Sequence, residues 1–260
     1  MICETPSLAH RYILGMRVDA TSYEDATSRV LAWAHAGESR YVCVATVHMV
    51  MEAHDSPEFR NIVNAADLVT PDGIPLVWSL RLFGAKQATR VYGPELTPRV
   101  LESAARAGVP VGFYGGSSEV LERLRAVADR RFAGLKVTYA YAPPFRPLSH
   151  EEDERIIRDI NASGARIIFV GIGCPKQERW MALHRGRLGA VMLGVGAAFD
   201  FLAGAKAQAP HWMQRLGLEW FFRLVTEPRR LWRRYLRNNP RFVVLLALQL
   251  CQRRKWEAEA

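Results

Sequence analysis

Short apolar runs alternate with amphipathic stretches along most of the chain. The runs have the length of buried strands, and the amphipathic stretches have the spacing of helices. The expected strands are residues 13–18, 41–46, a short run beginning at 68, 109–114, 135–141, 166–170 and 190–193. The expected helices are residues 22–36, 57–65, 74–83, 94–107, 119–132, 149–162 and 174–184. Ser149 and Glu152 have the spacing of a capping box, which supports the start of one of these helices.

This alternation indicates an α/β fold with a mostly parallel sheet covered by helices. After about residue 209 the pattern changes. Residues 210–225 have a helical pattern rich in aromatic side chains, Glu227-Pro228 interrupts it, and the pattern resumes over 229–236. We therefore expect two units, an α/β core over 1–208 and a basic, aromatic, helical appendage over 209–260.

Charge is concentrated in the second unit. Residues 211–260 carry 11 Lys+Arg and 4 Asp+Glu, so they hold most of the net charge of +9. The basicity therefore describes a surface that meets anions. The four cysteines are scattered, no secretory signal is evident, and the longest apolar run, 242–250, is about half of a spanning helix. These features predict a cytoplasmic protein that contacts a membrane only at its surface.

A tight turn follows the short strand at 68. Pro71 fixes its own φ, Gly73 tolerates a positive φ, and Asp72 lies between them. The turn holds one carboxylate at the carboxyl end of a strand, which is the edge where open α/β sheets bind ligands. The alternative is that Asp72 only caps the helix that follows.

Three other strands end in glycine. Glycine there lets backbone amides and a helix N-terminus come close to a phosphate. No loop completes the dinucleotide fingerprint and no P-loop is present, so a nicotinamide enzyme is disfavoured while a nucleotide diphosphate remains open. The structural alternative is that the glycines are required by the turns alone. The candidate phosphate-contacting glycines are Gly115, Gly116, Gly171 and Gly173.

Polar residues lie beside these loops. Lys176 and Gln177 occupy the first turn of the helix after Gly173, where either could reach a bound ligand. Asp200 stands among apolar neighbours and is therefore either paired or functional. There is no D-x-D pair of the kind that clamps a metal in many sugar-nucleotide enzymes, so we expect no metal site.

Arginines and aromatic residues interleave in the appendage. Arg230, Arg233, Arg234 and Arg237 recur at helical spacing. An anionic membrane interface suits this composition, with arginines at phosphates and aromatic rings at headgroup depth. An RNA-binding arm is the main alternative, and a solvated helix face is the simplest. The apolar run 242–250 favours a membrane over RNA.

Six segments, taken together and in this order, resemble the bacterial WecG/TagA/CpsF glycosyltransferases. The likeness covers about residues 10–240. The segments are ADLVTPDG (66–73), RVYGPEL (90–96), GFYGG (112–116), VGIGCPKQE (170–178), GVGAAFDF (194–201) and LEWFFRLVTEPRRLWRRY (218–235).

The resemblance implies a Rossmann-like core and an inverting, metal-independent transferase of cell-surface polysaccharide assembly. Such an enzyme moves a sugar, N-acetylmannosamine in the best-known branch, from a UDP-sugar to an undecaprenyl-diphosphate-linked sugar at the cytoplasmic membrane face. Self-association is a further expectation, whereas nucleic acid is not an expected partner.

The resemblance also assigns roles to residues. It places the catalytic base at Asp72 and other site positions at Arg90 and Gln177. It places contacts to the lipid diphosphate at Arg223, Arg230 and Arg233. One departure concerns a Thr-x-Asn pattern after the second strand, where this chain has Val44 and Thr46. Val44 therefore stands where the family has threonine and Thr46 where it has asparagine, and a polar contact is expected to be lost or shortened there.

Two other functions stay open from the residues alone. One is a nucleotide- or RNA-binding protein without transfer activity, in which the basic appendage holds nucleic acid. The other is a metal-dependent sugar-nucleotide hydrolase, whose activity EDTA would remove.

Overall fold

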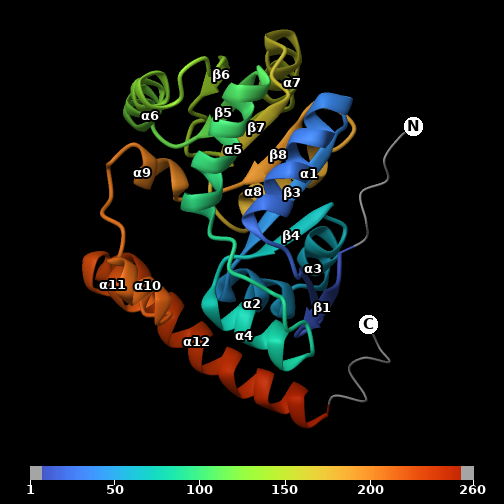
Figure 1. The fold of residues 1–260 in the computed structure, drawn as a ribbon, viewed down its shortest axis with the longest axis vertical. Coiled ribbons are helices and arrows are strands. Elements are labelled where there is room, and N and C mark those ends of the chain that lie inside the picture. The colour runs from blue at the N-terminus through green and yellow to red at the C-terminus, as the bar shows by residue number, and fades with distance from the viewer. Residues whose placement is uncertain (1–7, 253–260) are drawn as a thin grey trace.

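The structure is a computed structural model that describes residues 8–252. Strands and helices alternate along most of the chain, and helices alone make up its last part (Figure 1). The strands are β1 (His10–Ile13), β2 (Met16–Asp19), β3 (Arg40–Ala45), β4 (Leu68–Pro71), β5 (Val111–Gly115), β6 (Val137–Tyr141), β7 (Ile167–Gly171) and β8 (Val191–Gly194). The core helices are α1 (Tyr23–Ala36), α2 (Val47–Asp55), α3 (Pro57–Asn64), α4 (Ile74–Leu82), α5 (Gly93–Ala107), α6 (Ser118–Arg131), α7 (His150–Ser163), α8 (Lys176–His184) and α9 (Ala198–Leu202). The last helices are α10 (His211–Arg215), α11 (Glu219–Thr226) and α12 (Pro228–Cys251).

Six of the strands form one parallel sheet in the order β4-β3-β8-β7-β5-β6. The prediction of a helix-covered, mostly parallel α/β fold is confirmed. Because all six strands run the same way, the turns that follow β3, β4, β5, β7 and β8 emerge at one edge. Every strand-end motif singled out in the sequence therefore reaches the same side of the molecule.

The side chains of each central strand divide between two cores. In β3, Tyr41, Cys43 and Ala45 pack on one face of the sheet, whereas Val42 and Val44 pack on the other. This follows from the two-residue period of a strand, and both sets are buried because helices cover both faces. The first core includes residues of α2, α3 and α8, and the second includes residues of α1, α5 and α6.

The first expected strand, 13–18, was wrong in its extent. This stretch instead forms a hairpin, in which β1 and β2 pair antiparallel outside the main sheet. The turn falls on Leu14 and Gly15, both at positive φ, and Leu14 is fully buried. A buried leucine at a turn hides the turn from a hydrophobicity pattern, which is why the two strands looked like one.

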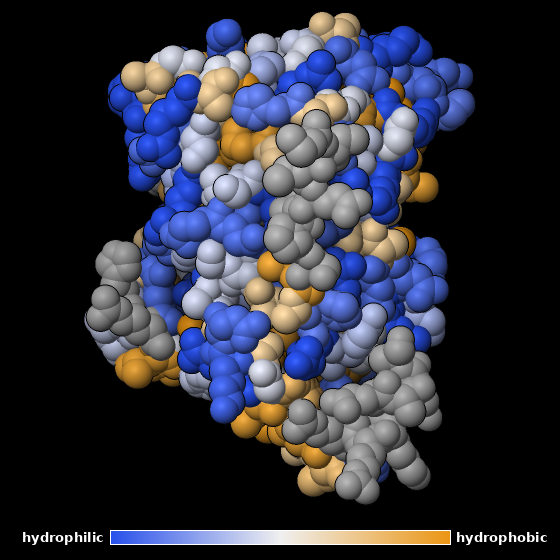
Figure 2. All heavy atoms as spheres, turned by 45° about the vertical axis from the view of Figure 1, so that its right-hand side comes forward, coloured by the Kyte–Doolittle hydropathy of each residue, from blue (hydrophilic) through white to orange (hydrophobic). Residues whose placement is uncertain are grey.

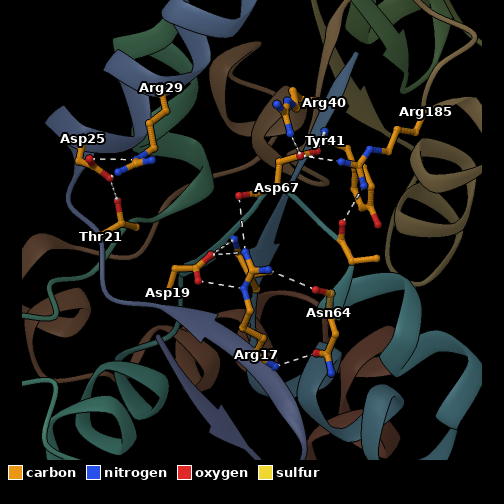
Figure 3. A network of polar contacts seen from close by, with 12 residues as sticks. Arg17, Asp19, Thr21, Asp25, Arg29, Arg40, Tyr41, Asn64, Asp67 and Arg185 are labelled. Atoms are coloured by element: carbon orange, nitrogen blue, oxygen red, sulfur yellow. Dashed lines mark hydrogen bonds and ion pairs between the residues drawn. The ribbon is translucent and has the colours of Figure 1, made fainter. Parts of the chain in front are cut away.

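A polar network fixes the hairpin to the amino end of β4 (Figure 3). Arg17 forms a bidentate pair with Asp19, and the Asp19 carboxylate accepts a bond from the amide of Val69 at 2.7 Å. Asp67 accepts bonds from Arg40 and Arg185 at 2.6 and 2.8 Å. Charges that are paired in this way can be buried at limited cost. The network anchors β4 at the end opposite to the Asp72 turn.

Within residues 209–252 the appendage forms three helices where the sequence predicts two segments. The helical pattern of 210–225 is broken around Gly217, whose φ is +71°, into α10 and α11. Helix α12 begins at Pro228, just before the predicted segment 229–236, and continues through Pro240 to Cys251. No helix within residues 8–252 is both long and apolar enough to cross a membrane.

The second half of α12 is fixed to the core. Gln249 is buried, donates to the carbonyl of Tyr12 at 2.8 Å and accepts from the amide of Leu14 at 2.9 Å. Phe242 belongs to the first core, and Arg241 pairs with Asp55 of α2 at 2.7 Å. These contacts hold the helix beside the carboxyl edge of the sheet. The proposed division between residues 208 and 209 stays a prediction.

Candidate active site

A cavity of about 1610 Å3 opens at the carboxyl edge of the sheet. Turns after β3, β4, β7 and β8 form one wall, and α11 and α12 contribute another. Eleven of the thirteen predicted site residues line it: Thr46, Asp72, Arg90, Gly116, Gly171, Gly173, Lys176, Gln177, Asp200, Arg223 and Arg230. The other two, Gly115 and Arg233, are not among its described lining residues.

The Asp72 turn is held by its backbone. The amide of Asp72 donates to the carbonyl of Ala45 at 2.9 Å, and its carbonyl accepts from Arg90 Nε at 2.6 Å. Gly73, not Asp72, is the N-cap of α4, and no side chain caps that helix. The interpretation of Asp72 as a helix cap is therefore wrong. Its carboxylate is left available to the cavity.

Burial changes the acidity of this carboxylate. The side chain of Asp72 is 15% exposed, and desolvation, as the largest cause, raises its pKa from 3.8 to about 7. The positive charge of Arg90 opposes this rise, whereas the negative charge of Glu219 adds to it. A carboxylate with a pKa near neutrality can accept a proton from a substrate and release it afterwards. This is the property that a general base requires.

Arg90 lies between two carboxylates. Its Nη2 is 2.6 Å from Glu219 Oε2 and 3.6 Å from Asp72 Oδ1, and its guanidinium stacks on the Tyr92 ring at 4.1 Å. Glu219 comes from α11, so this pair connects the appendage directly to the Asp72 turn. Glu219 was not predicted as a site residue. Its only signal was an acidic residue in a basic segment.

Two of the predicted glycines meet backbone to backbone. A Cβ on Gly115 would lie 2.5 Å from the carbonyl carbon of Gly171, and the φ of Gly115 is +123°. Glycine at 115 is therefore required by this close approach, as the structural alternative held. Gly173 has nothing within 4 Å of the place where a Cβ would be, and it lines the cavity. A ligand can come close to the chain at Gly173.

Gln177 is fixed at the start of α8. It is buried, its Oε1 accepts from the amide of Gly173 at 3.2 Å, and its Nε2 donates to Glu178 at 2.8 Å. Glu178 is fully buried, and desolvation raises its pKa to about 7. Lys176 is exposed at the cavity wall. Gln177 therefore forms an ordered part of the cavity wall, and Lys176 places an exposed positive charge beside it.

Comparison with known proteins gives one family. Residues 11–256 match the model of the glycosyl transferase WecG/TagA/CpsF family. The chain belongs to this family. The match covers the α/β core together with α10, α11 and α12, so the segment that supplies Glu219 lies within the matched range.

Two predicted site residues of this glycosyltransferase also have structural partners. The Thr46 hydroxyl caps α2 by accepting from the amide of Met49 at 3.4 Å. Asp200 forms an ion pair with Lys206 at 2.8 Å, which fits the paired alternative for this carboxylate. Both residues line the cavity, so a structural partner and a ligand contact are compatible at each.

The four arginines at helical spacing on α12 face different surroundings. Arg230 lines the cavity and pairs with Glu227 at 2.9 Å. Arg234 also lines the cavity, although it was not among the predicted site residues. Arg233 is exposed and stacks on Trp232 at 5.2 Å, and Arg237 lies 3.7 Å from Asp55.

No group of three or more His, Cys, Asp or Glu side chains that could hold a metal ion occurs within the described part of the chain. Metal independence stays a prediction.

Proposed function

We propose that this glycosyltransferase is an inverting enzyme of cell-surface polysaccharide assembly. Its donor would be a UDP-sugar of the N-acetylmannosamine type or a related hexose. Its acceptor would be a sugar linked to undecaprenyl diphosphate. The observation that carries the proposal is Asp72, a carboxylate with a pKa of about 7 in a cavity shared by the glycine loops and the arginines of α11 and α12.

The reaction is a single displacement. The acceptor hydroxyl oxygen attacks the anomeric carbon of the donor while Asp72 takes the hydroxyl proton. The bond between that carbon and the diphosphate oxygen breaks, and UDP leaves with the electron pair, so the configuration inverts. General-base assistance of this kind contributes about 10²–10⁴-fold to a rate.

The negative charge of the departing UDP needs a binding partner. The turn at Gly171–Gly173 and the start of α8 line the cavity beside Gln177, and they are suited to hold phosphate oxygens. Arg90 is the first side-chain candidate, although Glu219 already occupies one of its amino groups. Because these groups are protein donors, the proposal requires no metal.

Membrane contact is proposed for the appendage and α4. Exposed apolar side chains occur on both, including Trp78, Phe221, Val225, Trp232 and Leu236. Hydrophobic residues come to the surface along the lower edge of the molecule in Figure 2, the level at which Figure 1 places α4 and α12. Apolar and aromatic groups next to arginines suit an anionic interface. We propose the inner face of the cell membrane, where a lipid-linked acceptor is held close to the cavity.

Arg223 and Arg230 line the cavity and are proposed to contact the lipid diphosphate. Arg233 is exposed and off the described cavity wall, so it is left out of this proposal. Self-association stays a prediction.

The direct test offers a panel of UDP-sugars with a short-chain, diphosphate-linked sugar acceptor, with and without EDTA. We expect one donor to give a product of inverted configuration and EDTA to leave the rate unchanged. A rate that EDTA removes would instead support a metal-dependent enzyme. If no donor reacts, liposome flotation and RNA retention at two salt concentrations decide between a membrane protein and a nucleic-acid-binding one.

A further inference from the structure

Helix α11 places an acid, Glu219, inside the cavity. Its side chain is only 13% exposed, and it lines the same cavity as Asp72. Its Oε2 accepts a hydrogen bond from Arg90 Nη2 at 2.6 Å. A carboxylate is costly to bury unless a partner of opposite charge is bonded to it. The bond to Arg90 therefore accounts for the presence of this acid beside the proposed base.

Arg90 is held in one orientation by three contacts. Its Nε donates to the carbonyl of Asp72 at 2.6 Å, its Nη2 donates to Glu219, and its guanidinium stacks on the Tyr92 ring at 4.1 Å. The Asp72 carboxylate lies 3.6 Å from the same Nη2, which is beyond a hydrogen bond. Glu219 therefore takes the hydrogen bond of Arg90 that could otherwise go to the Asp72 carboxylate.

The charged and titratable groups that face Asp72 come from two parts of the chain. Arg90 and Tyr92 lie just before α5, and Glu219 and Arg223 lie on α11. Burial raises the pKa of Tyr92, so this side chain stays neutral. Burial is also the largest cause of the raised pKa of Asp72; Arg90 and Arg223 oppose the rise, and Glu219 adds to it. Glu219 is thus the acid in a set that is otherwise basic or neutral.

We propose that Glu219 is a positioning residue for the transfer reaction, which holds Arg90 out of a close ion pair with Asp72 and so leaves that carboxylate free to take the acceptor proton. The inference rests on the proposed function, in which Asp72 is the base, and adds a residue to which the family resemblance assigns no role. A close pair with an arginine would stabilise the ionised carboxylate and make it a weaker base. Asp72 is therefore fully basic only while α11 is packed on the core.

The experiment measures the titration of Asp72 itself. Nuclear magnetic resonance follows the protein isotope-labelled at its aspartate carboxyl carbons, and Asp72→Asn identifies the signal. Glu219→Gln keeps the shape of the side chain and removes its charge. The two carboxylates share one nitrogen of Arg90, so their nearest oxygens are at most about 6 Å apart. At an effective dielectric constant of about 20, we expect Glu219→Gln to lower the pKa of Asp72 by about one to two pH units.

The matched control is Glu227→Gln, which removes an acid of the appendage that pairs with Arg230 at 2.9 Å instead of Arg90. The pKa of Asp72 should stay at its wild-type value in this variant. Equal shifts in both variants would assign the effect to the net charge of the appendage and overturn the proposal. An unchanged or higher pKa of Asp72 in Glu219→Gln would also overturn it.

A shorter acid gives a second variant. Glu219→Asp keeps the charge but reaches less far towards Arg90, so the pKa of Asp72 should fall by less than in Glu219→Gln. If Glu219→Gln does not fold, this variant decides the point, and an unchanged pKa of Asp72 in Glu219→Asp then overturns the proposal.

Sugar transfer in single turnovers gives a further readout that a merely structural residue would not move. In Glu219→Gln the inflection of the pH–rate profile should move down with the pKa of Asp72, and the rate above it should be lower, since a weaker base accepts the proton less readily. A faster rate would show that Glu219 competes with the substrate for Arg90, and would overturn the proposal. Failure of the proposed function is a separate result, because it appears as absent transfer in the donor panel whatever the titration of Asp72 shows.

Discussion

Replacing Asp72 by asparagine should make the protein more stable while removing its activity. Asparagine has nearly the same shape as aspartate but no charge. The native state holds Asp72 where ionisation is unfavourable, with a pKa of about 7 against an ordinary 3.8. In the unfolded chain this carboxyl group ionises with its ordinary pKa. Each pKa unit between the folded and unfolded states therefore destabilises the folded protein by about 1.4 kcal/mol once the pH exceeds both pKa values.

The size of the gain depends on pH. The destabilisation that Asp72 causes is absent below about pH 3.8, grows as the pH rises from there to about 7, and is constant above about pH 7. At about pH 8 it amounts to about 4 kcal/mol, and at about pH 5 to about 2 kcal/mol. Asparagine escapes the penalty at every pH. The stabilisation of Asp72→Asn should therefore be about twice as large at the higher pH.

Urea unfolding followed by tryptophan fluorescence at the two pH values measures this difference. Asp200→Asn is the matched control, because it removes a carboxylate of the same cavity wall that is ion-paired with Lys206 at 2.8 Å. This control should gain no stability. A gain in stability for Asp72→Asn that is equal at both pH values, or a loss of stability at about pH 8, would refute the view that burial makes ionisation of Asp72 unfavourable in the folded protein.

Two further predictions concern the scaffold of the site. Gly115→Ala should lower the free energy of unfolding by more than about 2 kcal/mol, because its Cβ would lie 2.5 Å from Gly171. Thermal unfolding checks this against Gly134→Ala, which also has a positive φ, +81°, but open space around the added Cβ, and equal losses would contradict the packing reason. Gln249→Leu removes two hydrogen bonds to the hairpin and should cost about 1–3 kcal/mol in urea unfolding. Unchanged stability would show that α12 is held by its apolar contacts alone.

Much of the fold could be predicted because most elements carry local signals. The capping box at Ser149 and Glu152 is present, and α7 begins directly after Ser149. The errors occurred where a local signal was weak or misleading. Helix α2 was missed because it follows β3 after Thr46 alone, which caps the helix although it was counted in the strand. Helix α12 was predicted too short because Pro240 lies inside it.

Part of the candidate site could also be predicted, because some of its residues carry local signals in the sequence. Asp72 stands in a turn whose chemistry is visible in the sequence, and its place at the edge of a parallel sheet follows from the fold. Glu219 and Arg234 could not be found in this way. Their places in the cavity wall depend on how α11 and α12 pack over the cavity, and Arg233 and Arg234 look equivalent until the helix is oriented. Which of these two arginines lines the cavity is decided by how α12 packs on the rest of the protein.

The most direct test of the central claim, that Asp72 is the base, is the pH dependence of sugar transfer in single turnovers. For the wild type, the rate should rise about tenfold per pH unit below about 7 and level off above it, since only the ionised carboxylate accepts the proton. Asp72→Asn should be slower by about 10²–10⁴-fold and lose this dependence. Near wild-type turnover by Asp72→Asn, with the same pH profile, would contradict the assignment.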